Sequence, residues 1–176
     1  MPDDVTPALN PRILVVDDVA AMAEQYAYDL KRLAGYRTRV AGSGRDALAA
    51  LVEEDVDCMI LDLEMPGMDG FEVLRALNDR QIDVPVIVYT GTGDFERCAQ
   101  AIRLGAYSFI DKAESMQRVV QEVRNALERG QVVREVTGIR RILPAGGRAT
   151  NPRLHGPQKR VSDTGLSDGH WRRRGK

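Results

Sequence analysis

Polar side chains end several short apolar runs of this sequence. One run ends on Asp17 and Asp18, a second ends on Asp62, a third ends on the hydroxyl of Thr90, and Lys112 follows a fourth. Apolar runs bounded by turn residues are typical of strands that are buried on both faces of a parallel sheet. The carboxyl ends of such strands share one edge of the sheet, which is where ligands bind. These five side chains are therefore expected to converge.

This group of side chains suits phosphoryl transfer. Carboxylates that are packed together raise one another's pKa, and Mg²⁺ relieves this cost because it prefers oxygen ligands. A Mg²⁺ ion held by Asp18 and Asp62 can also bind a phosphoryl oxygen. Lys112 supplies a positive charge for a second oxygen, and the Thr90 hydroxyl donates to a third. Asp62 is a competent nucleophile, because Asp carboxylates form aspartyl phosphates.

Five strands and five helices alternate along the predicted core. The predicted strands are residues 12–18, 36–41, 58–62, 84–90 and 108–110. The predicted helices are residues 19–34, a helix capped by Ser43, a helix with Phe71, Leu74 and Leu77 on its apolar face, a helix from Asp94 to Leu104, and a helix from Ser115 to about residue 136. This alternation predicts an α/β fold with a parallel sheet, right-handed crossovers and helices on both faces.

Charge divides the chain into two parts. Residues 1–137 hold 15 Lys and Arg against 24 Asp and Glu, a net charge of −9, whereas residues 138–176 hold 10 against 2, a net charge of +8. The basic part is rich in Gly, Pro and Arg and has few large apolar residues, so it cannot bury enough surface to offset chain entropy. The predicted organisation is a disordered lead over residues 1–11, a folded domain over 12–137 and a disordered basic tail over 138–176.

The sequence gives no indication of secretion or of membrane contact. Residues 1–11 lack the apolar segment of a secretory signal, and no stretch approaches the roughly 20 apolar residues that a membrane span needs. Cys58 and Cys98 lack metal-ligand spacing and suit buried positions in a reducing compartment. The predicted location is the cytoplasm.

Residues 12 to about 130 resemble the receiver domain of two-component response regulators. The matching segments are Val-Val-Asp17-Asp18, Leu-Asp62-Leu-Glu-Met-Pro-Gly-Met-Asp-Gly, Thr90-Gly, and Gly-Ala-Tyr-Ser-Phe109-Ile-Asp-Lys112. Their order and spacing agree with the family throughout. The resemblance implies a flavodoxin-like, doubly wound sheet of five parallel strands in the order 2-1-3-4-5, with five helices.

The resemblance also implies a role for each residue. Asp62 would accept a phosphoryl group from a sensor histidine kinase or a phosphotransfer protein, which would contact the first helix and the loop after the fifth strand. Asp17, Asp18, Asp62 and the backbone carbonyl of Glu64 would hold Mg²⁺. Thr90 and Lys112 would bind the phosphoryl group. Thr90 and Phe109 would act as the switch, changing a face formed by the fourth helix, fifth strand and fifth helix that binds a downstream protein.

The sequence departs from the family pattern at three positions. Ala113 follows Lys112 where the family usually has proline, often after a cis bond, so the geometry of this loop is open. Glu64 places a carboxylate two residues after Asp62, where it points either at the site or to solvent. Phe109 has no hydroxyl, so a switch at this position would rely on packing alone.

Other functions compete with this interpretation. A receiver can keep the fold and serve only for docking, although the five intact site residues argue against this. A Mg²⁺-dependent phosphohydrolase would want a dedicated acid–base residue beside Asp62, which the sequence does not offer; the protein is therefore predicted to catalyse only its own phosphorylation and slow dephosphorylation. Nucleic-acid binding by the tail is a further alternative, since Trp171 lies beside a run of three arginines. A homodimer and a monomer are both compatible with the sequence.

Overall fold

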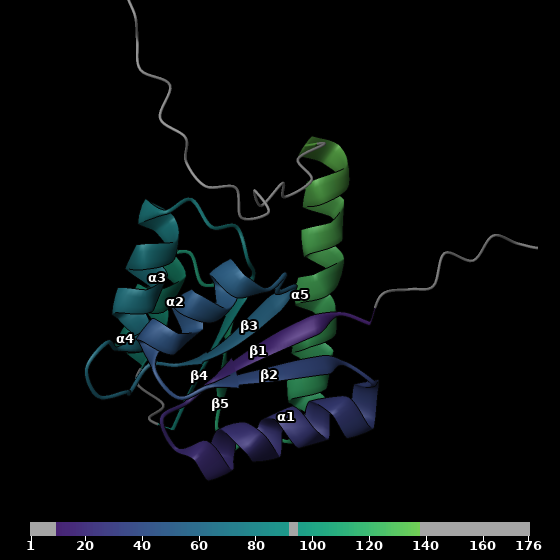
Figure 1. Ribbon diagram of the computed structural model, residues 1–176, viewed down its shortest axis with the longest axis horizontal. Coiled ribbons are helices and arrows are strands. Elements are labelled where there is room, and N and C mark those ends of the chain that lie inside the picture. The colour runs from purple at the N-terminus through teal and green to yellow at the C-terminus, as the bar shows by residue number, and fades with distance from the viewer. Residues whose placement is uncertain (1–9, 92–94, 138–176) are drawn as a thin grey trace, which may run out of the picture. The chain divides into compact units, whose positions relative to one another are not determined.

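The computed structural model describes residues 10–91 and 95–137, which fold into alternating strands and helices (Figure 1). The strands are β1 (Arg12–Val16), β2 (Arg37–Ala41), β3 (Cys58–Asp62), β4 (Val86–Thr90) and β5 (Ser108–Asp111). The helices are α1 (Ala20–Ala34), α2 (Gly44–Glu53), α3 (Gly70–Asp79), α4 (Phe95–Arg103) and α5 (Met116–Thr137). The predicted tail, residues 138–176, lies outside the described residues, and its predicted disorder and boundary stay predictions.

The five strands form one parallel sheet in the order β2-β1-β3-β4-β5. One apolar cluster joins the sheet to α2, α3 and α4, and a second joins its other face to α1 and α5 (Figure 1). The central strand β3 is buried at every position, as expected for a strand that is covered by helices on both faces. The predicted fold class is therefore confirmed for the described domain.

Two helices begin at the capping serines that the sequence predicts. The Ser43 hydroxyl accepts a hydrogen bond from the Asp46 amide at 3.1 Å, and the Ser115 hydroxyl accepts one from the Arg118 amide at 3.3 Å, so both predicted caps are confirmed. The third predicted cap, Asp94, lies outside the described residues.

Helix α3 buries the predicted face and adds a cap that was not predicted. Phe71, Leu74 and Leu77 are buried as expected. The Asp69 carboxylate accepts a hydrogen bond from the Glu72 amide at 2.8 Å, and the Glu72 carboxylate accepts one from the Asp69 amide at 2.9 Å. This reciprocal capping box fixes the start of α3 immediately after the loop that follows β3.

Strand β4 begins two residues later than predicted. The expected strand started at residue 84, whereas the ladder starts at Val86. Pro85 has no amide hydrogen to donate to the ladder, although its carbonyl accepts a hydrogen bond from the Met59 amide at 2.9 Å. The proline therefore lies at the entrance to the strand rather than within it.

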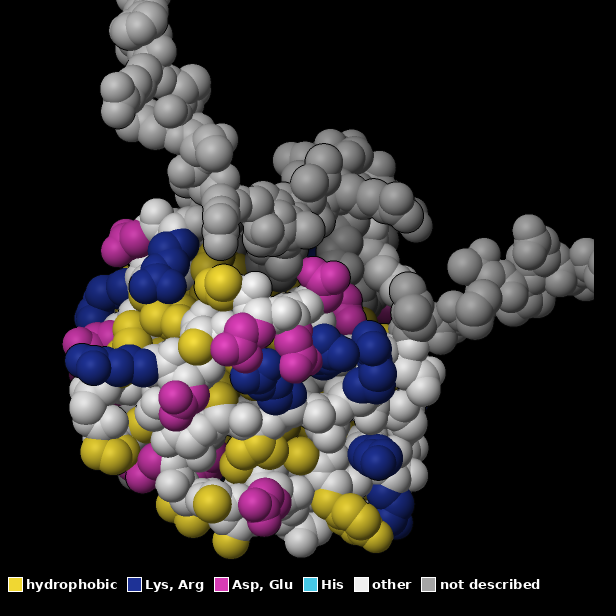
Figure 2. All heavy atoms as spheres, in the orientation of Figure 1, with side chains coloured by type: hydrophobic (Ala, Val, Ile, Leu, Met, Phe, Trp, Pro, Cys, Tyr) yellow, Lys and Arg dark blue, Asp and Glu magenta, His cyan; other side chains and the backbone are white. Residues whose placement is uncertain are grey.

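Arginines mark the edge strand β2. Arg37 and Arg39 alternate along this strand, and Arg39 forms ion pairs with Glu53 at 2.6 Å and with Glu54 at 2.8 Å. Arg12 of the neighbouring strand β1 contacts Glu54 at 2.6 Å. Figure 2 views the side of the molecule that carries β1, β2, α1 and α2, and shows basic and acidic side chains intermixed across it.

Among the described residues, no helix has the length and apolar character that a membrane crossing requires.

Candidate functional site

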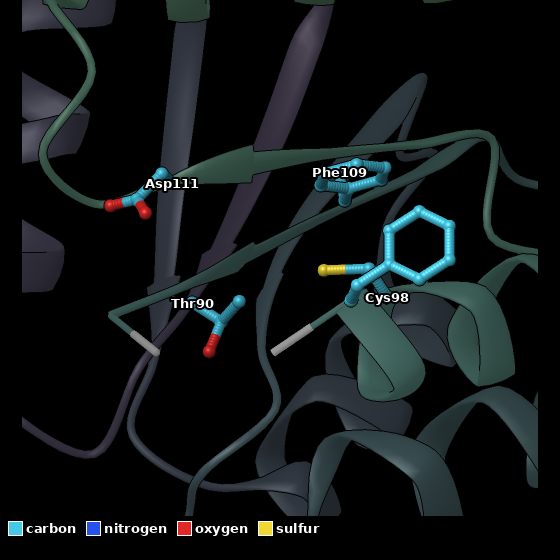
Figure 3. A pocket seen from close by; sticks show the side chains of 5 residues that line it. Thr90, Cys98, Phe109 and Asp111 are labelled. Atoms are coloured by element: carbon cyan, nitrogen blue, oxygen red, sulfur yellow. The ribbon is translucent and has the colours of Figure 1, made fainter. Parts of the chain in front are cut away.

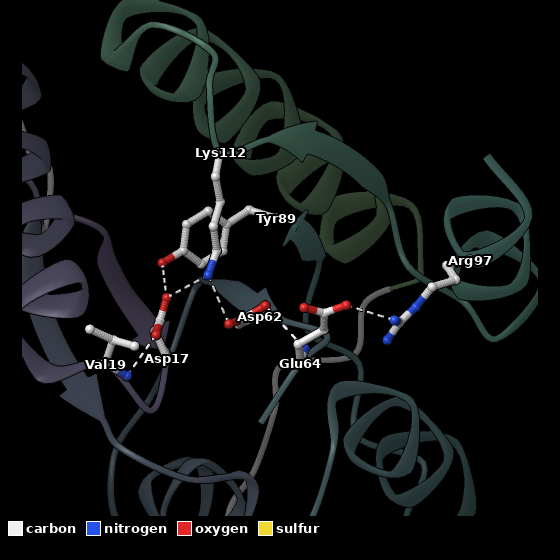
Figure 4. A network of polar contacts seen from close by, with 7 residues as sticks. All are labelled: Asp17, Val19, Asp62, Glu64, Tyr89, Arg97 and Lys112. Atoms are coloured by element: carbon white, nitrogen blue, oxygen red, sulfur yellow. Dashed lines mark hydrogen bonds and ion pairs between the residues drawn. The ribbon is translucent and has the colours of Figure 1, made fainter. Parts of the chain in front are cut away.

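Lys112 joins two carboxylates at the carboxyl edge of the sheet. Its Nζ lies 2.8 Å from Asp62 Oδ2 and 3.0 Å from Asp17 Oδ2 (Figure 4). Asp62 ends β3, Asp17 follows β1 and Lys112 follows β5, so three strands contribute to this contact. Both carboxylates are buried, and the Lys112 side chain is 21% exposed. The parallel order of the strands thus brings together groups that lie 45 and 50 positions apart along the chain.

Burial acts on the pKa values of Asp62 and Lys112 in opposite directions. Burial raises the pKa of Asp62 above its ordinary value, although the hydrogen bonds from Lys112 and from the Glu64 amide oppose the rise. Burial lowers the pKa of Lys112, but its hydrogen bonds to Asp62 and Asp17 outweigh burial and leave the pKa above its ordinary value. Lys112 therefore stays protonated at neutral pH and compensates two buried carboxylates.

Asp18 completes an acidic cluster with Asp17 and Asp62. One carboxylate oxygen from each of the three residues lies within 4.8 Å of the others. Asp18 is exposed, so the cluster opens to solvent on its side. Three carboxylate oxygens at this spacing are the donor set that Mg²⁺ prefers, so the residues present fit a divalent cation.

Both oxygens of Asp17 accept hydrogen bonds. Oδ1 accepts from the Val19 amide at 2.8 Å, and Oδ2 accepts from the Tyr89 hydroxyl as well as from Lys112 (Figure 4). Burial raises the pKa of Tyr89 well above its ordinary range, and the adjacent Asp17 carboxylate raises it further. Sequence analysis did not predict the role of Tyr89. Every residue of β4 is buried, so the sequence pattern does not show which face of the sheet each side chain lies on.

Glu64 is bound to helix α4. Its amide donates to Asp62 Oδ1 at 3.1 Å, whereas its carboxylate forms an ion pair with Arg97 at 2.7 Å (Figure 4). The Arg97 guanidinium also lies over the Phe71 ring, 5.5 Å from its centroid. The sequence left open whether this side chain points at the site or to solvent. It does neither fully, because it is 49% exposed and Arg97 holds it at the rim of the site.

The loop after Lys112 is held by Asp111. The Ala113 amide donates to Asp111 Oδ1 at 2.8 Å, and the Glu114 amide donates to the Asp111 carbonyl at 2.9 Å. The Lys112 amide donates to the Thr90 carbonyl at 3.0 Å, which continues the sheet to the point where the side chain turns toward Asp62. Proline has no amide hydrogen and could not donate this bond. The alanine that replaces the usual proline of the family therefore lets Asp111 hold the loop.

Thr90 and Phe109 line a cavity of about 100 Å³. Phe95, Cys98 and Asp111 complete its lining, and Figure 3 shows Thr90 and Phe109 facing it from neighbouring strands. Thr90 is buried, whereas the Phe109 ring is 46% exposed. The two predicted switch residues therefore border one space.

Comparison with known proteins identifies the class of this domain. The family model of the response regulator receiver domain matches residues 13–124, which is more than half of the chain. The chain belongs to the response regulator receiver family.

The relatives include larger regulators. The C4-dicarboxylate transport transcriptional regulatory protein DctD of Rhizobium meliloti is 33% identical over 162 residues, covering 88% of this chain and 35% of DctD. The transcriptional regulatory protein FixJ of Bradyrhizobium diazoefficiens is 28% identical over 141 residues, covering 80% of this chain and 68% of FixJ. The chain thus spans about a third of the length of the two DctD proteins that it matches.

Solved structures show the same fold. The signal receiver domain of a LuxO repressor protein from Vibrio parahaemolyticus superposes with a TM-score of 0.69 at 30% identity, covering 74% of this chain and all of that chain. NtrX from Brucella abortus, solved with ADP, gives a TM-score of 0.69 at 33% identity over 75% of this chain and 30% of NtrX.

Proposed function

We propose that Asp62 is the phosphoacceptor of a response regulator, and that it receives its phosphoryl group from a phosphohistidine of a sensor histidine kinase or a phosphotransfer protein. The observation that carries this proposal is the bridge from Lys112 to Asp62 and Asp17 beside the exposed carboxylate of Asp18. A nucleophilic carboxylate, a fixed cation and an acidic pocket are the parts that phosphoryl transfer needs.

In the proposed reaction, an Asp62 carboxylate oxygen attacks phosphorus. The new P–O bond forms as the bond between phosphorus and the donor nitrogen breaks, and the histidine keeps the electron pair. Lys112 balances the negative charge of the phosphoryl oxygens, and the Thr90 hydroxyl donates a hydrogen bond to one of them. Asp17, Asp18, Asp62 and the Glu64 carbonyl are the proposed Mg²⁺ ligands. When bound, Mg²⁺ neutralises charge on the phosphoryl oxygens.

This chemistry acts on the protein itself rather than on a released substrate. The Glu64 carboxylate is engaged by Arg97 at the rim of the site, so it is not placed as a general base for rapid turnover. We therefore propose slow self-dephosphorylation in place of phosphohydrolase activity.

Incubation with Mg²⁺ and acetyl phosphate tests the proposal. Intact mass spectrometry of the full chain should show one added phosphoryl group, which disappears when EDTA replaces Mg²⁺ and is absent from Asp62→Asn. Asp55→Asn is the matched control, because Asp55 is an exposed carboxylate outside the cluster. If the wild type gains no phosphoryl group with Mg²⁺ present, the proposed phosphorylation of Asp62 is wrong.

The cavity beside Thr90 supports the proposed switch. Movement of Thr90 toward the phosphoryl group would enlarge this space, and the half-exposed Phe109 ring would turn into it. The present volume is about 100 Å³, which is smaller than the roughly 150 Å³ cavity that holds benzene in other proteins. The ring therefore enters only after the lining moves, which makes its position dependent on Thr90.

The proposed output is a protein contact on α4, β5 and α5. Phe95, Ile102 and Phe109 expose apolar surface on the first two of these elements, at 78%, 42% and 46%. We propose that a downstream protein, or a second copy of the chain, binds this face, and that the kinase binds α1 and the loop after β5. The proposed location is the cytoplasm, where the buried thiols of Cys58 and Cys98 stay reduced.

Nucleic-acid binding is a second candidate output. The charge of +8 on residues 138–176 favours it, because basic segments bind phosphate backbones through counterion release. DctD and FixJ are named as transcriptional regulatory proteins.

Arg97→Ala should shorten the life of the phosphorylated protein. It removes the ion pair that holds the Glu64 carboxylate at the rim of the site, so the carboxylate can move toward the phosphoryl group and orient a water molecule. Because a part-exposed ion pair is worth up to about 1 kcal/mol, the rate of phosphate loss should rise about two- to fivefold. Mass spectrometry over time after removal of the donor measures this rate. Arg103→Ala, on the exposed side of the same helix, should leave it unchanged. A longer lifetime in Arg97→Ala would contradict the assignment.

A further inference from the structure

The Tyr89 hydroxyl contacts the acidic cluster, and none of the proposed steps uses it. Its ring is buried at the end of β4, and its hydroxyl donates to Asp17 Oδ2 (Figure 4). Asp62 is the register partner of Tyr89 on the adjacent strand, so the tyrosine lies beside the phosphoacceptor in the sheet.

Two neighbouring side chains pack against this ring. The Tyr26 ring of α1 lies 4.7 Å from it between centroids, at an interplanar angle of 56°. The Lys112 Nζ that contacts Asp62 and Asp17 also lies over the Tyr89 ring, 4.6 Å from its centroid. Rotation of the Tyr89 side chain away from Asp17 would break both contacts, so they favour the position in which the hydroxyl donates to Asp17.

The hydroxyl takes up acceptor capacity that a cation would need. A carboxylate offers about four acceptor positions. On Asp17, the Val19 amide, Lys112 and Tyr89 donate to Oδ1, Oδ2 and Oδ2 respectively. Oδ2 thus already receives two donors, and the only unfilled position that these bonds leave is on Oδ1. Each donor also draws negative charge from the carboxylate and so weakens its attraction for a metal ion.

We propose that the Tyr89 hydroxyl competes with the divalent cation for Asp17, so that Tyr89 is a positioning residue that sets how readily the acidic cluster takes up Mg²⁺. This inference rests on the proposed function, because it takes the cluster to be the Mg²⁺ site. It goes further by assigning a residue of β4 that acts on the metal through Asp17 without being a ligand.

Tyr89→Phe tests the competition, because it removes the hydroxyl and keeps the ring that contacts Tyr26 and Lys112. Without the donor, Oδ2 of buried Asp17 regains an acceptor position, so Mg²⁺ can use either oxygen of this carboxylate. Isothermal titration of the full chain with MgCl₂ should show a Kd about three- to tenfold lower than that of the wild type. Saturating Mg²⁺ should also raise the thermal unfolding midpoint more in Tyr89→Phe than in the wild type.

Two variants separate this effect from a general loss of packing. Tyr26→Phe removes a hydroxyl from the adjoining ring but leaves the bond between Tyr89 and Asp17, so its Kd for Mg²⁺ should match the wild type. In an Asp17→Asn background, adding Tyr89→Phe should no longer tighten Mg²⁺ binding, because the carboxylate for which the two compete is gone.

The outcomes distinguish the inference from the proposed function. If the wild type binds Mg²⁺ and Tyr89→Phe binds it equally or more weakly, the competition is wrong and the proposed function stands. If Tyr89→Phe binds more tightly but does so equally in the Asp17→Asn background, the effect does not pass through Asp17 and the inference is again wrong. If the wild type takes up no Mg²⁺, the proposed function fails and the inference fails with it.

Discussion

Lys112→Met should reduce phosphoryl uptake by Asp62 about 10²- to 10³-fold, the usual effect of removing a single charge-stabilising donor from a reaction site. The lysine lies 2.8 Å from Asp62 Oδ2, so in the proposed reaction it stands next to the oxygens on which charge develops. Methionine keeps the length and the apolar stem of the side chain but not its charge. The rate of adduct formation with acetyl phosphate and saturating Mg²⁺ measures the loss, and Lys31→Met, at an exposed position on α1, is the control.

The same substitution should lower the free energy of unfolding by about 3 kcal/mol, because it leaves two buried carboxylates without their counter-charge. Urea denaturation at neutral pH without divalent cations measures this change. Lys112 is 21% exposed, which places the expected cost at the lower end for a broken buried pair. A change of less than 1 kcal/mol would show that solvent already screens the carboxylates and that the lysine is not their main compensation.

The loss of unfolding free energy in Lys112→Met should also depend on pH. Burial raises the folded-state pKa of Asp62 above its unfolded value, and the loss of Lys112 removes a group that opposes this rise. The folded variant therefore binds a proton at Asp62 more readily than its unfolded state does, and protonation relieves the repulsion. The difference in unfolding free energy between wild type and Lys112→Met should be largest at neutral pH and should shrink as the pH falls through the raised pKa of Asp62.

Gly70→Ala should destabilise the domain by about 3 kcal/mol, at the upper end for overpacking, because the added methyl group would meet backbone rather than a flexible side chain. A Cβ at this position would lie 2.5 Å from the Asp62 carbonyl oxygen and 2.8 Å from Leu63 Cα. Gly70 begins α3, and its amide donates to the Leu63 carbonyl at 3.2 Å. The methyl group therefore forces the start of the helix away from the end of β3.

Gly42→Ala is the matched control for this substitution, since a Cβ there meets no atom within 4 Å. Its free energy of unfolding should stay within about 0.5 kcal/mol of the wild type. Because the displaced backbone in Gly70→Ala belongs to the strand that carries Asp62, phosphoryl uptake should fall as well. A Gly70→Ala protein as stable as Gly42→Ala would show that α3 can shift at little cost.

The fold could be predicted because its signals are local and repeat along the chain. Apolar runs, caps such as Ser43, and the rule that parallel strands share a carboxyl edge are sufficient to bring Asp17, Asp62 and Lys112 to one place. What the sequence could not show are contacts that depend on side-chain direction. In β4 every residue is buried, so alternation does not reveal that Tyr89 faces Asp17.

The Glu64 contact was missed for a different reason. Glu64 and Arg97 lie 33 positions apart, and their contact depends on how α4 packs beside the loop after β3. Nothing in the spacing of these two residues predicts such a pairing, because charged residues are common in both segments. The reciprocal bonds of Asp69 and Glu72 were not predicted either, although a capping residue and a Glu three positions later are a known signal for a helix start.

The arginines of β2 bear on how copies of this protein meet in solution. An uncovered strand at the edge of a sheet presents backbone groups that can pair with another chain and begin aggregation. Here Arg37 and Arg39 occupy alternate positions of that strand, and the Arg37 guanidinium bonds to the Asn10 carbonyl at 2.9 Å beside it. Two such edges brought together would oppose the charges of their Arg37 side chains, which discourages growth of the sheet from one molecule into the next.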